Sequence, residues 1–233
     1  MHVILMGPQG SGKGTQAARL SPRLQLVLVA TGDLFRRAIS AETGLGRQIK
    51  VAYGRGELIS DDLTVALVGE KLDEMSAERA VGTGIQGALY DGFPRTRAQA
   101  DSLDGELHQR GEGISAVIQI IVPRQTLVDR LAGRRVCAKC GAVYHIEFNP
   151  PRVPGICDRC GGEVRQRQDD TPEAIEKRLD LYEQETAPLI AHYRERDLVT
   201  VVNGDQAIDV VTDEIERAIH QGVASRSGAS GND

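Results

Sequence analysis

The chain has 233 residues, with 28 Lys or Arg against 33 Asp or Glu and a formal net charge of -5 at pH 7. This excess of acidic residues excludes a protein that is basic overall, as is typical of nucleic-acid binding. The lack of Trp also leaves few aromatic side chains on which bases could stack. No apolar run approaches the roughly 20 residues that span a bilayer. Met1-His2 leads directly into an apolar run, so we expect no signal peptide, no membrane partner and a cytoplasmic protein. The length suits one α/β core with inserted subdomains.

A glycine-rich segment, Gly7 to Thr15, follows the apolar run Val3 to Met6 and precedes a helical pattern from Gln16 to Leu24. Strand, glycine-rich loop and helix is the context of a phosphate-binding loop. The glycines let successive backbone N–H groups turn toward an anion, and the positive end of the next helix adds to their field. Lys13 adds an ammonium group for the outer phosphates.

The loop departs from the general phosphate-loop pattern at one position. Gly14 follows Lys13 where a Mg²⁺-holding Ser or Thr is usual, and the hydroxyl comes one residue later, on Thr15. The run GxxGxGKGT resembles the loop of nucleoside monophosphate kinases, and later motifs narrow the resemblance to adenylate kinases. The resemblance implies a P-loop NTPase-type parallel sheet flanked by helices. It also implies that the loop binds ATP through Gly10, Ser11, Gly12, Lys13, Gly14 and Thr15.

Short helices are expected between two core elements at residues 31–60. Thr31 to Asp33 interrupts an apolar strand over 25–29 and is predicted to cap a helix over 34–40, before a second helix over 45–53. Ser60 is predicted to cap a helix over 61–75. In adenylate kinases this segment is the AMP-binding subdomain, although Ala30 stands where the family usually has Ser. The residues that match its AMP-binding positions are Thr31, Arg36, Glu57, Leu58 and Ile59.

A second motif, Asp91 to Thr96, follows a short predicted strand over 88–90. Asp91 at the carboxyl end of a strand faces the crevice where α/β proteins bind ligands, and it can hold Mg²⁺ through the water shell of the ion. Arg95 offers a guanidinium fork for a phosphate. The amide of Gln99 can pair with the amino group and a ring nitrogen of adenine, which favours AMP over pyrimidine monophosphates. By resemblance, the AMP site also includes Gly92, Phe93 and Pro94.

The remaining core elements are a strand over 116–122, a helix over 123–131, a strand over 198–202 and a final helix over 207–220. Residues 221–233 are rich in Ser, Gly and Asn and are expected to be a disordered tail. The resemblance implies that Arg130 packs against the adenine of ATP and that Arg134 grips its phosphates. It places three further residues at the ATP site, namely Val143, Tyr144 and Gln206.

All four cysteines lie in two CxxC pairs, Cys137 with Cys140 and Cys157 with Cys160, separated by 16 residues. This is zinc-ribbon spacing, and four protein ligands leave no open position, so the predicted Zn²⁺ is structural. A small insert with few apolar residues cannot build its own core, which makes a metal useful there. The alternatives are disulfides, free thiols without a metal, iron on the same four sulfurs, and His145 as a competing ligand. The segment resembles the zinc-bearing lid of bacterial adenylate kinases.

The lid is expected to end before Thr171-Pro172-Glu173, which predicts the start of a helix that reaches about residue 194 with a kink or new start at Pro188. By resemblance, Arg167 and Arg178 are phosphate-binding residues that belong to the AMP site and act in catalysis, oriented by Asp169 and Asp170. The expected domains are therefore a core at 1–30, 61–133 and 171–220, the AMP-binding subdomain at 31–60 and the lid at 134–170.

The expected reaction is Mg²⁺-dependent phosphoryl transfer, ATP + AMP = 2 ADP, by a monomer. No general base is needed, because the acceptor phosphate has a second pKa of about 6 and is already an anion at pH 7. The chemistry instead requires positive charge around two polyanions and the moving phosphoryl group. The residues expected to act in catalysis are Lys13, Asp91, Arg95, Arg134, Arg167 and Arg178.

Two other functions fit parts of the sequence. One is a kinase for UMP, CMP or GMP, against which Gln99 argues. The other is a zinc-ribbon ATPase that binds nucleic acid, against which the net charge of -5 argues.

Overall fold

The computed structural model describes residues 1–54, 59–167 and 170–227. The predicted AMP-site residues Glu57 and Leu58, and the predicted orienting residue Asp169, lie outside the described residues. None of the helices in the described ranges is both long and apolar enough to cross a membrane.

A five-stranded parallel sheet forms the centre of the molecule, with strand order β2-β3-β1-β4-β8. All five residues of β1 are buried, as expected for an apolar run in the middle of a parallel sheet. In register, Leu5 of β1 lies opposite Asp91 of β3, so the ends of these two strands meet at one edge. The strands are β1 (His2–Met6), β2 (Leu26–Ala30), β3 (Gly87–Asp91), β4 (Ile114–Ile121) and β8 (Val199–Asn203).

Helices cover both faces of this sheet. Alternate residues of β1 divide between two cores, with Ile4 and Met6 in one and Val3 and Leu5 in the other. The first core packs against α4 (Asp61–Ala80), α5 (Arg97–Gln109) and α8 (Pro188–Arg194), and the second against α1 (Lys13–Arg23) and α9 (Ile208–Ser227). The sheet therefore has the doubly covered α/β architecture that the sequence predicted.

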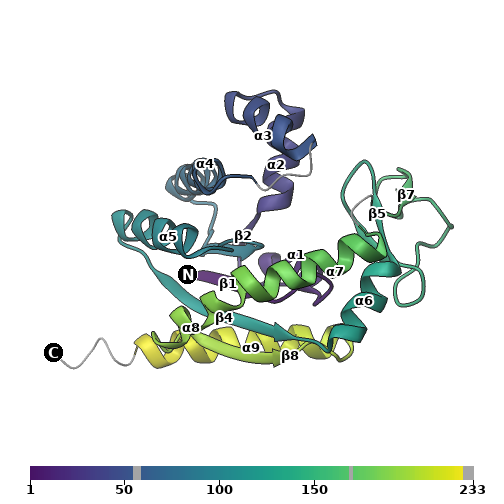
Figure 1. Ribbon diagram of the computed structural model, residues 1–233. Helices are drawn as coiled ribbons and strands as arrows, with labels where there is room; N and C mark the ends of the chain where they lie inside the picture. The colour runs from purple at the N-terminus through teal and green to yellow at the C-terminus, as the bar shows by residue number, and fades with distance from the viewer. Residues whose placement is uncertain (55–58, 168–169, 228–233) are drawn as a thin grey trace.

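Two segments project from the core (Figure 1). One contains α2 (Thr31–Ser40) and α3 (Gly44–Gly54), which stand above the sheet. The other is a small antiparallel sheet with strand order β6-β5-β7, carried beside α6 (Arg124–Ala132) and α7 (Pro172–Leu181). Its strands are β5 (Arg134–Cys137), β6 (Val143–His145) and β7 (Val164–Arg165).

Several predicted boundaries change in the structure. Thr31 does not cap α2, because the helix begins at Thr31 itself and the Thr31 hydroxyl donates to the carbonyl oxygen of Gly92, 3.1 Å away. Ser60 and Thr171 do cap their helices, accepting from the backbone N–H groups of Leu63 and Ala174. A π-helical turn over 182–186 joins α7 to α8, which starts at Pro188.

The final helix also extends further than predicted. α9 continues to Ser227, seven residues beyond the expected end at His220, so the expected disordered tail from residue 221 is wrong as far as Ser227. Ile215, Ala218 and Ile219 bury one side of this helix against the sheet. That packing anchors the helix just before the extension, and further turns can propagate from an existing helix at a lower cost than nucleation.

Candidate functional site

A cleft of about 2400 Å³ opens at the carboxyl ends of the central strands. This is where ligands bind in open α/β sheets. The cleft is lined by the loop after β1, by the loop after β3, by α2, and by residues of the small sheet and α7. It is larger than the roughly 300–1000 Å³ of ordinary small-molecule pockets, so it has room for two large ligands.

The loop between β1 and α1 forms one wall of the cleft. Gly10 and Gly12 have φ angles of 84° and 96°, the left-handed region that glycine adopts without strain. A Cβ atom on Gly10 would also lie 3.0 Å from the carbonyl oxygen of Leu127, which adds a packing reason for glycine. Alternating glycines of this kind point backbone N–H groups into a common hollow, an anion-binding arrangement.

The ammonium group of Lys13 folds back over this loop. Its Nζ atom donates to the carbonyl oxygens of Gly7 and Pro8, at 2.6 and 2.9 Å. Burial lowers the pKa of Lys13 to about 8, and Arg95, Arg134 and Arg178 act in the same direction while Asp91 opposes them. Lys13 is therefore still mainly a cation at pH 7.

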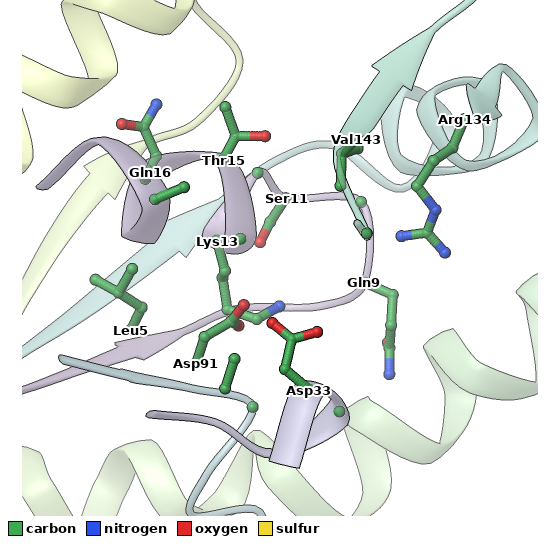
Figure 2. Close-up of a pocket in the computed structure, with 18 of the residues that line it drawn as sticks. Leu5, Gln9, Ser11, Lys13, Thr15, Gln16, Asp33, Asp91, Arg134 and Val143 are labelled. Carbon is green, nitrogen blue, oxygen red and sulfur yellow. The ribbon is translucent and has the colours of Figure 1, made fainter. Parts of the chain in front are cut away.

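Two carboxylates face Lys13 across the cleft. Figure 2 shows the Lys13 side chain directed toward Asp91, at the end of β3, and Asp33, on α2. Burial raises the pKa of Asp91, Asp33 raises it further, and Lys13 and Arg95 lower it. The Oδ2 atom of Asp91 lies only 3.3 Å from the place where a Cβ atom on Gly14 would stand. This contact gives a physical reason for glycine where a Ser or Thr is usual.

The loop after β3 is held in place by backbone groups. The carbonyl oxygen of Gly92 accepts from the Thr31 hydroxyl at 3.1 Å and from Nε of Arg95 at 2.8 Å. Phe93 and Pro94 are buried beside it. The guanidinium of Arg95 is thereby fixed at the wall of the cleft.

Gln99 is also fixed, by partners that sequence analysis did not identify. Its amide oxygen accepts from the backbone N–H of Arg95 at 2.8 Å, and its amide nitrogen donates to Asp61 at 2.6 Å. The side chain is 5% exposed and lines the cleft. A primary amide has a second hydrogen and further lone-pair capacity, so Gln99 can still make one donor and one acceptor contact with a ligand.

Two arginines on the opposite wall share one buried carboxylate. Asp170 has no exposed side-chain surface, and it accepts from Nε of Arg134 at 2.8 Å and from Nη1 of Arg178 at 3.3 Å. Arg134 begins β5 and Arg178 lies on α7, so Asp170 joins the small sheet to the helix that carries it. A planar carboxylate between two guanidinium groups fixes their orientation toward the cleft.

The first turns of α9 are held against α1 by a buried hydrogen-bonded pair. The Thr212 hydroxyl donates to the amide oxygen of Gln16 at 2.7 Å, and the Gln16 amide nitrogen donates to the carbonyl oxygen of Ile208 at 3.1 Å. In the loop that leads into this helix, Gln206 donates to the carbonyl oxygen of Asn203 at 2.9 Å. Gln206 therefore reaches the edge of the cleft from a loop that is anchored to the phosphate-loop helix.

The four cysteine sulfurs form a compact cluster at the tip of the small sheet. All lie within 4.8 Å of one another, and the Sγ–Sγ distances are 3.5 Å for Cys137–Cys160 and for Cys140–Cys157. Four thiolates around a tetrahedral metal at about 2.3 Å lie about 3.8 Å apart, whereas a disulfide requires about 2.05 Å. The donor set therefore fits Zn²⁺, and the cysteines are free thiols rather than disulfides.

Comparison with known proteins identifies the family. The family model for adenylate kinase matches residues 5–198. The chain is 49% identical to the adenylate kinase of Moorella thermoacetica over 94% of this chain and 98% of that protein. It is 47% identical to the adenylate kinases of Desulfitobacterium hafniense and Symbiobacterium thermophilum, over 95% and 94% of this chain and 99% and 98% of those proteins.

The chain belongs to the adenylate kinase family. Enzymes of this family are nucleoside monophosphate kinases that catalyse ATP + AMP = 2 ADP and use Mg²⁺ with ATP. The predicted family, fold class and activity are confirmed. The two alternative functions, a kinase for another monophosphate and a nucleic-acid-binding ATPase, are not supported.

The structure gathers the predicted site residues of this adenylate kinase family member around one cleft. On the side of α1, α2 and β3 the cleft is lined by Gly10, Ser11, Gly12, Lys13, Gly14, Thr15, Thr31, Arg36, Ile59, Asp91, Gly92, Phe93, Pro94, Arg95 and Gln99. On the opposite side it is lined by Arg130, Arg134, Val143, Tyr144, Arg167, Arg178 and Gln206. The five arginines expected to act together, Arg36, Arg95, Arg134, Arg167 and Arg178, are all among these residues.

Sequence analysis missed some residues and left others open. Gln9 and Asp61 had no recognised role, although Gln9 lies inside the glycine-rich loop and Asp61 begins a predicted helix. His145 is not part of the cysteine cluster found among the described residues. Its Nδ1 atom accepts from the backbone N–H groups of Glu147 and Phe148, and its ring packs against Gly133.

Proposed function

We propose that two nucleotides bind in this cleft on opposite sides of Lys13. ATP occupies the phosphate loop and the wall formed by Arg130, Arg134, Val143, Tyr144 and the Gln206 backbone. AMP occupies the wall formed by Thr31, Arg36, Ile59, the segment 92–95 and Gln99. The observation that carries this proposal is that one cleft receives Lys13, Asp91 and arginines from both projecting segments.

Catalysis in this proposal is electrostatic. The phosphate of AMP is already an anion at pH 7, so no side chain has to remove a proton. Lys13 and Arg134 face the outer phosphates of ATP, and Arg36 and Arg95 face the phosphate of AMP. Arg167 and Arg178 lie between them, where negative charge spreads over the transferred phosphoryl group.

The metal that accompanies ATP has an acidic binding site. Asp91 and Asp33 offer carboxylates beside Lys13, and Mg²⁺ prefers oxygen ligands while it retains much of its water shell. When bound, the ion neutralises phosphate charge and helps to align the reacting groups.

The segments 31–60 and 134–170 close over the substrates in this proposal. The cleft of about 2400 Å³ exceeds the roughly 1000 Å³ of ordinary small-molecule pockets, which leaves room for its two walls to approach each other. Closure brings these charges together and excludes water, which would otherwise accept the phosphoryl group. Since one chain provides every wall of the cleft, we also propose that the enzyme works as a monomer.

Gln99 selects adenine in the acceptor site. Asp61 and the Arg95 backbone hold its amide in one orientation, with one hydrogen and one lone pair directed to a base. Adenine presents an acceptor beside a donor, which matches such an amide.

The four cysteines hold a structural Zn²⁺ in this proposal. The ion has four thiolate ligands and thus no open position for substrate, so its contribution is to the folding of the small sheet. A hydrogen bond from the Tyr144 hydroxyl lowers the pKa of Cys157 to about 6, which favours the thiolate that a metal requires.

A coupled assay for ADP formed from ATP and AMP tests the residue assignment. Lys13→Ala should lower kcat/KM at least 100-fold, because a single preorganised donor to a developing charge contributes about 10²–10³ in rate. Lys71→Ala is the matched control, since Lys71 pairs with Glu74 on the surface of α4 away from the cleft. A Lys13→Ala variant within threefold of the parent enzyme would contradict the assignment.

A further inference from the structure

The Tyr144 hydroxyl contacts the cysteine cluster from a strand outside the two CxxC turns. It lies 3.3 Å from Sγ of Cys157, which is 13 residues away in the sequence, and this contact is buried. The backbone N–H of Asp158 donates to the same hydroxyl oxygen at 2.8 Å. These two contacts hold the hydroxyl at the edge of the sulfur cluster.

The two contacts also fix the direction of the hydroxyl hydrogen. A backbone N–H can only donate, so the Tyr144 oxygen accepts from Asp158. A thiolate sulfur carries no hydrogen, so once Cys157 is deprotonated for a metal, the Tyr144 hydroxyl donates to its Sγ atom. The backbone N–H of Arg159 also donates to this sulfur, at 3.4 Å. Cys157 thus receives one donor from its own turn and a second from β6.

The position of Tyr144 on β6 explains how its hydroxyl reaches the sulfurs. Successive residues of a strand point to opposite faces. Tyr144 is 6% exposed and packs with Cys157, whereas Val143 is 48% exposed and lines the cleft. In register, the next residue of β6, His145, lies opposite Arg134 of β5. The strand that reaches the cysteine cluster is therefore the direct partner of the strand that begins with Arg134.

We propose that Tyr144 is a positioning residue of the metal centre, whose hydroxyl orients the Cys157 thiolate and helps to retain the ion. This inference rests on the proposed Zn²⁺ at the four cysteines. Groups that hydrogen-bond to metal ligands fix the orientation of those ligands, and their removal lowers metal affinity by about 10–100-fold. The same contact joins the metal centre to β6, and thereby to the wall of the cleft.

Competition with a chelator tests whether the hydroxyl retains the ion. Tyr144→Phe keeps the aromatic ring and removes only the hydroxyl, and its affinity for Zn²⁺ should fall about 10-fold relative to the parent protein. Tyr193→Phe is the matched control. Tyr193 is fully buried on α8, and its hydroxyl has no hydrogen-bond partner among the described residues. This variant should bind Zn²⁺ as tightly as the parent protein.

Co²⁺ in place of Zn²⁺ separates a hydrogen bond to sulfur from a packing role. Thiolate-bound Co²⁺ has a sulfur-to-metal charge-transfer band, and hydrogen bonds to the sulfur change the electronic properties of such a site. The band of Tyr144→Phe should move to longer wavelength, because a sulfur that lacks this donor gives up an electron more easily. The band of Tyr193→Phe should stay in place.

Hydrogen exchange at saturating Zn²⁺ shows whether Tyr144→Phe is folded. We expect amide protection over residues 134–167 to equal that of the parent protein under this condition, because the aromatic ring still packs in the buried cluster. The Co²⁺ band is likewise read on metal-loaded protein. A shift of that band with unchanged amide protection would support a hydrogen bond to sulfur.

The outcomes distinguish this inference from the zinc assignment. An affinity of Tyr144→Phe for Zn²⁺ within about twofold of the parent protein would overturn the inference alone. A lower affinity with an unshifted Co²⁺ band would also overturn it, because Tyr144 would then act only through packing. A parent protein that binds neither Zn²⁺ nor Co²⁺ would reject the zinc assignment itself, and the inference with it.

Discussion

The two segments that project from the core are stabilised in different ways. In the segment with α2 and α3, Ala38 and Ile49 are buried with Leu67 of α4 in an ordinary apolar cluster. In the small sheet, the buried cluster consists of Cys137, Ala142, Tyr144 and Cys157. The larger apolar side chains of this second segment lie outside its core, with Ile146 at 53% and Phe148 at 66% exposure.

This difference shows how a small insert obtains a fixed shape. The first segment packs its apolar residues against α4, a helix of the main core, so hydrophobic burial alone can stabilise it. The second segment stands on α6 and α7 with few apolar residues of its own, and four sulfurs converge where a core would otherwise be. A metal then replaces hydrophobic burial as the main source of stability. Four predictions follow this contrast from the largest expected effect to the smallest.

Removal of the metal should have the largest effect and should be confined to the small sheet. Structural Zn²⁺ contributes about 10–16 kcal/mol to the folding of isolated zinc-finger peptides. We expect chelation, or Cys157→Ser, to lower the melting temperature by roughly 10 °C and to abolish amide protection in 134–167. Hydrogen exchange read by mass spectrometry should show α2 and α3 unchanged. An equal loss of amide protection in both segments would contradict the proposal that only the small sheet depends on the metal.

The substitution Asp170→Ala should have the second largest effect. Removing one member of a buried ion-pair network costs about 3–5 kcal/mol, and here Arg134 and Arg178 lose the buried carboxylate that they share. Urea denaturation measures the loss, and activity should fall with it since both arginines lose their orientation. Glu74→Ala removes an ion pair with 63% exposure of the carboxylate and should cost under about 1 kcal/mol. Equal costs for the two variants would show that Asp170 does not hold the arginines.

Ile49→Ala tests the apolar segment. Ile49 is fully buried, and truncation of such a side chain costs about 2–5 kcal/mol through lost burial and the cavity that remains. The loss should be the same with and without chelator, as measured by thermal unfolding. Val81→Ala is the control, because Val81 is 80% exposed and should change stability by less than about 0.5 kcal/mol. A cost that depends on metal would connect the two segments energetically.

The smallest expected effect is a pH dependence of stability that arises from His2 in the main core. His2 is buried, accepts from the Tyr90 hydroxyl at 2.9 Å and donates from Nε2 to Glu112 at 2.9 Å, a pattern that fits the neutral ring. Burial lowers the pKa of His2 to about 4, although Glu112 opposes this shift.

The folded state therefore favours neutral His2, whereas the unfolded chain titrates near pH 6.5. This contribution to stability is complete above pH 6.5 and is lost as the pH falls toward 4, by about 2 kcal/mol at pH 5. Denaturation curves between pH 8 and 5 should show this extra loss in the parent protein but not in His2→Gln. Parallel pH dependence in the two proteins would contradict it.

Local patterns of the sequence determined most of the fold and most of the candidate site. The glycine-rich loop, Asp91 after an apolar strand and the paired CxxC turns each depend on residues close together in the chain. Backbone geometry and side-chain chemistry therefore restrict what such short motifs can form. This is why the phosphate loop, the position of Asp91 at the carboxyl end of a strand and the cysteine cluster could be predicted.

Tertiary structure alone decided which groups satisfy one another across the cleft. The hydrogen-bond partners of Gln99 are Asp61 and the Arg95 backbone. The Thr31 hydroxyl donates to the carbonyl oxygen of Gly92 and does not cap its own helix. The sequence also predicted an end of α9 at His220, whereas the helix continues to Ser227. Such contacts join residues distant in sequence, and the cost of an unsatisfied buried polar group or an exposed apolar face appears only once the chain is folded.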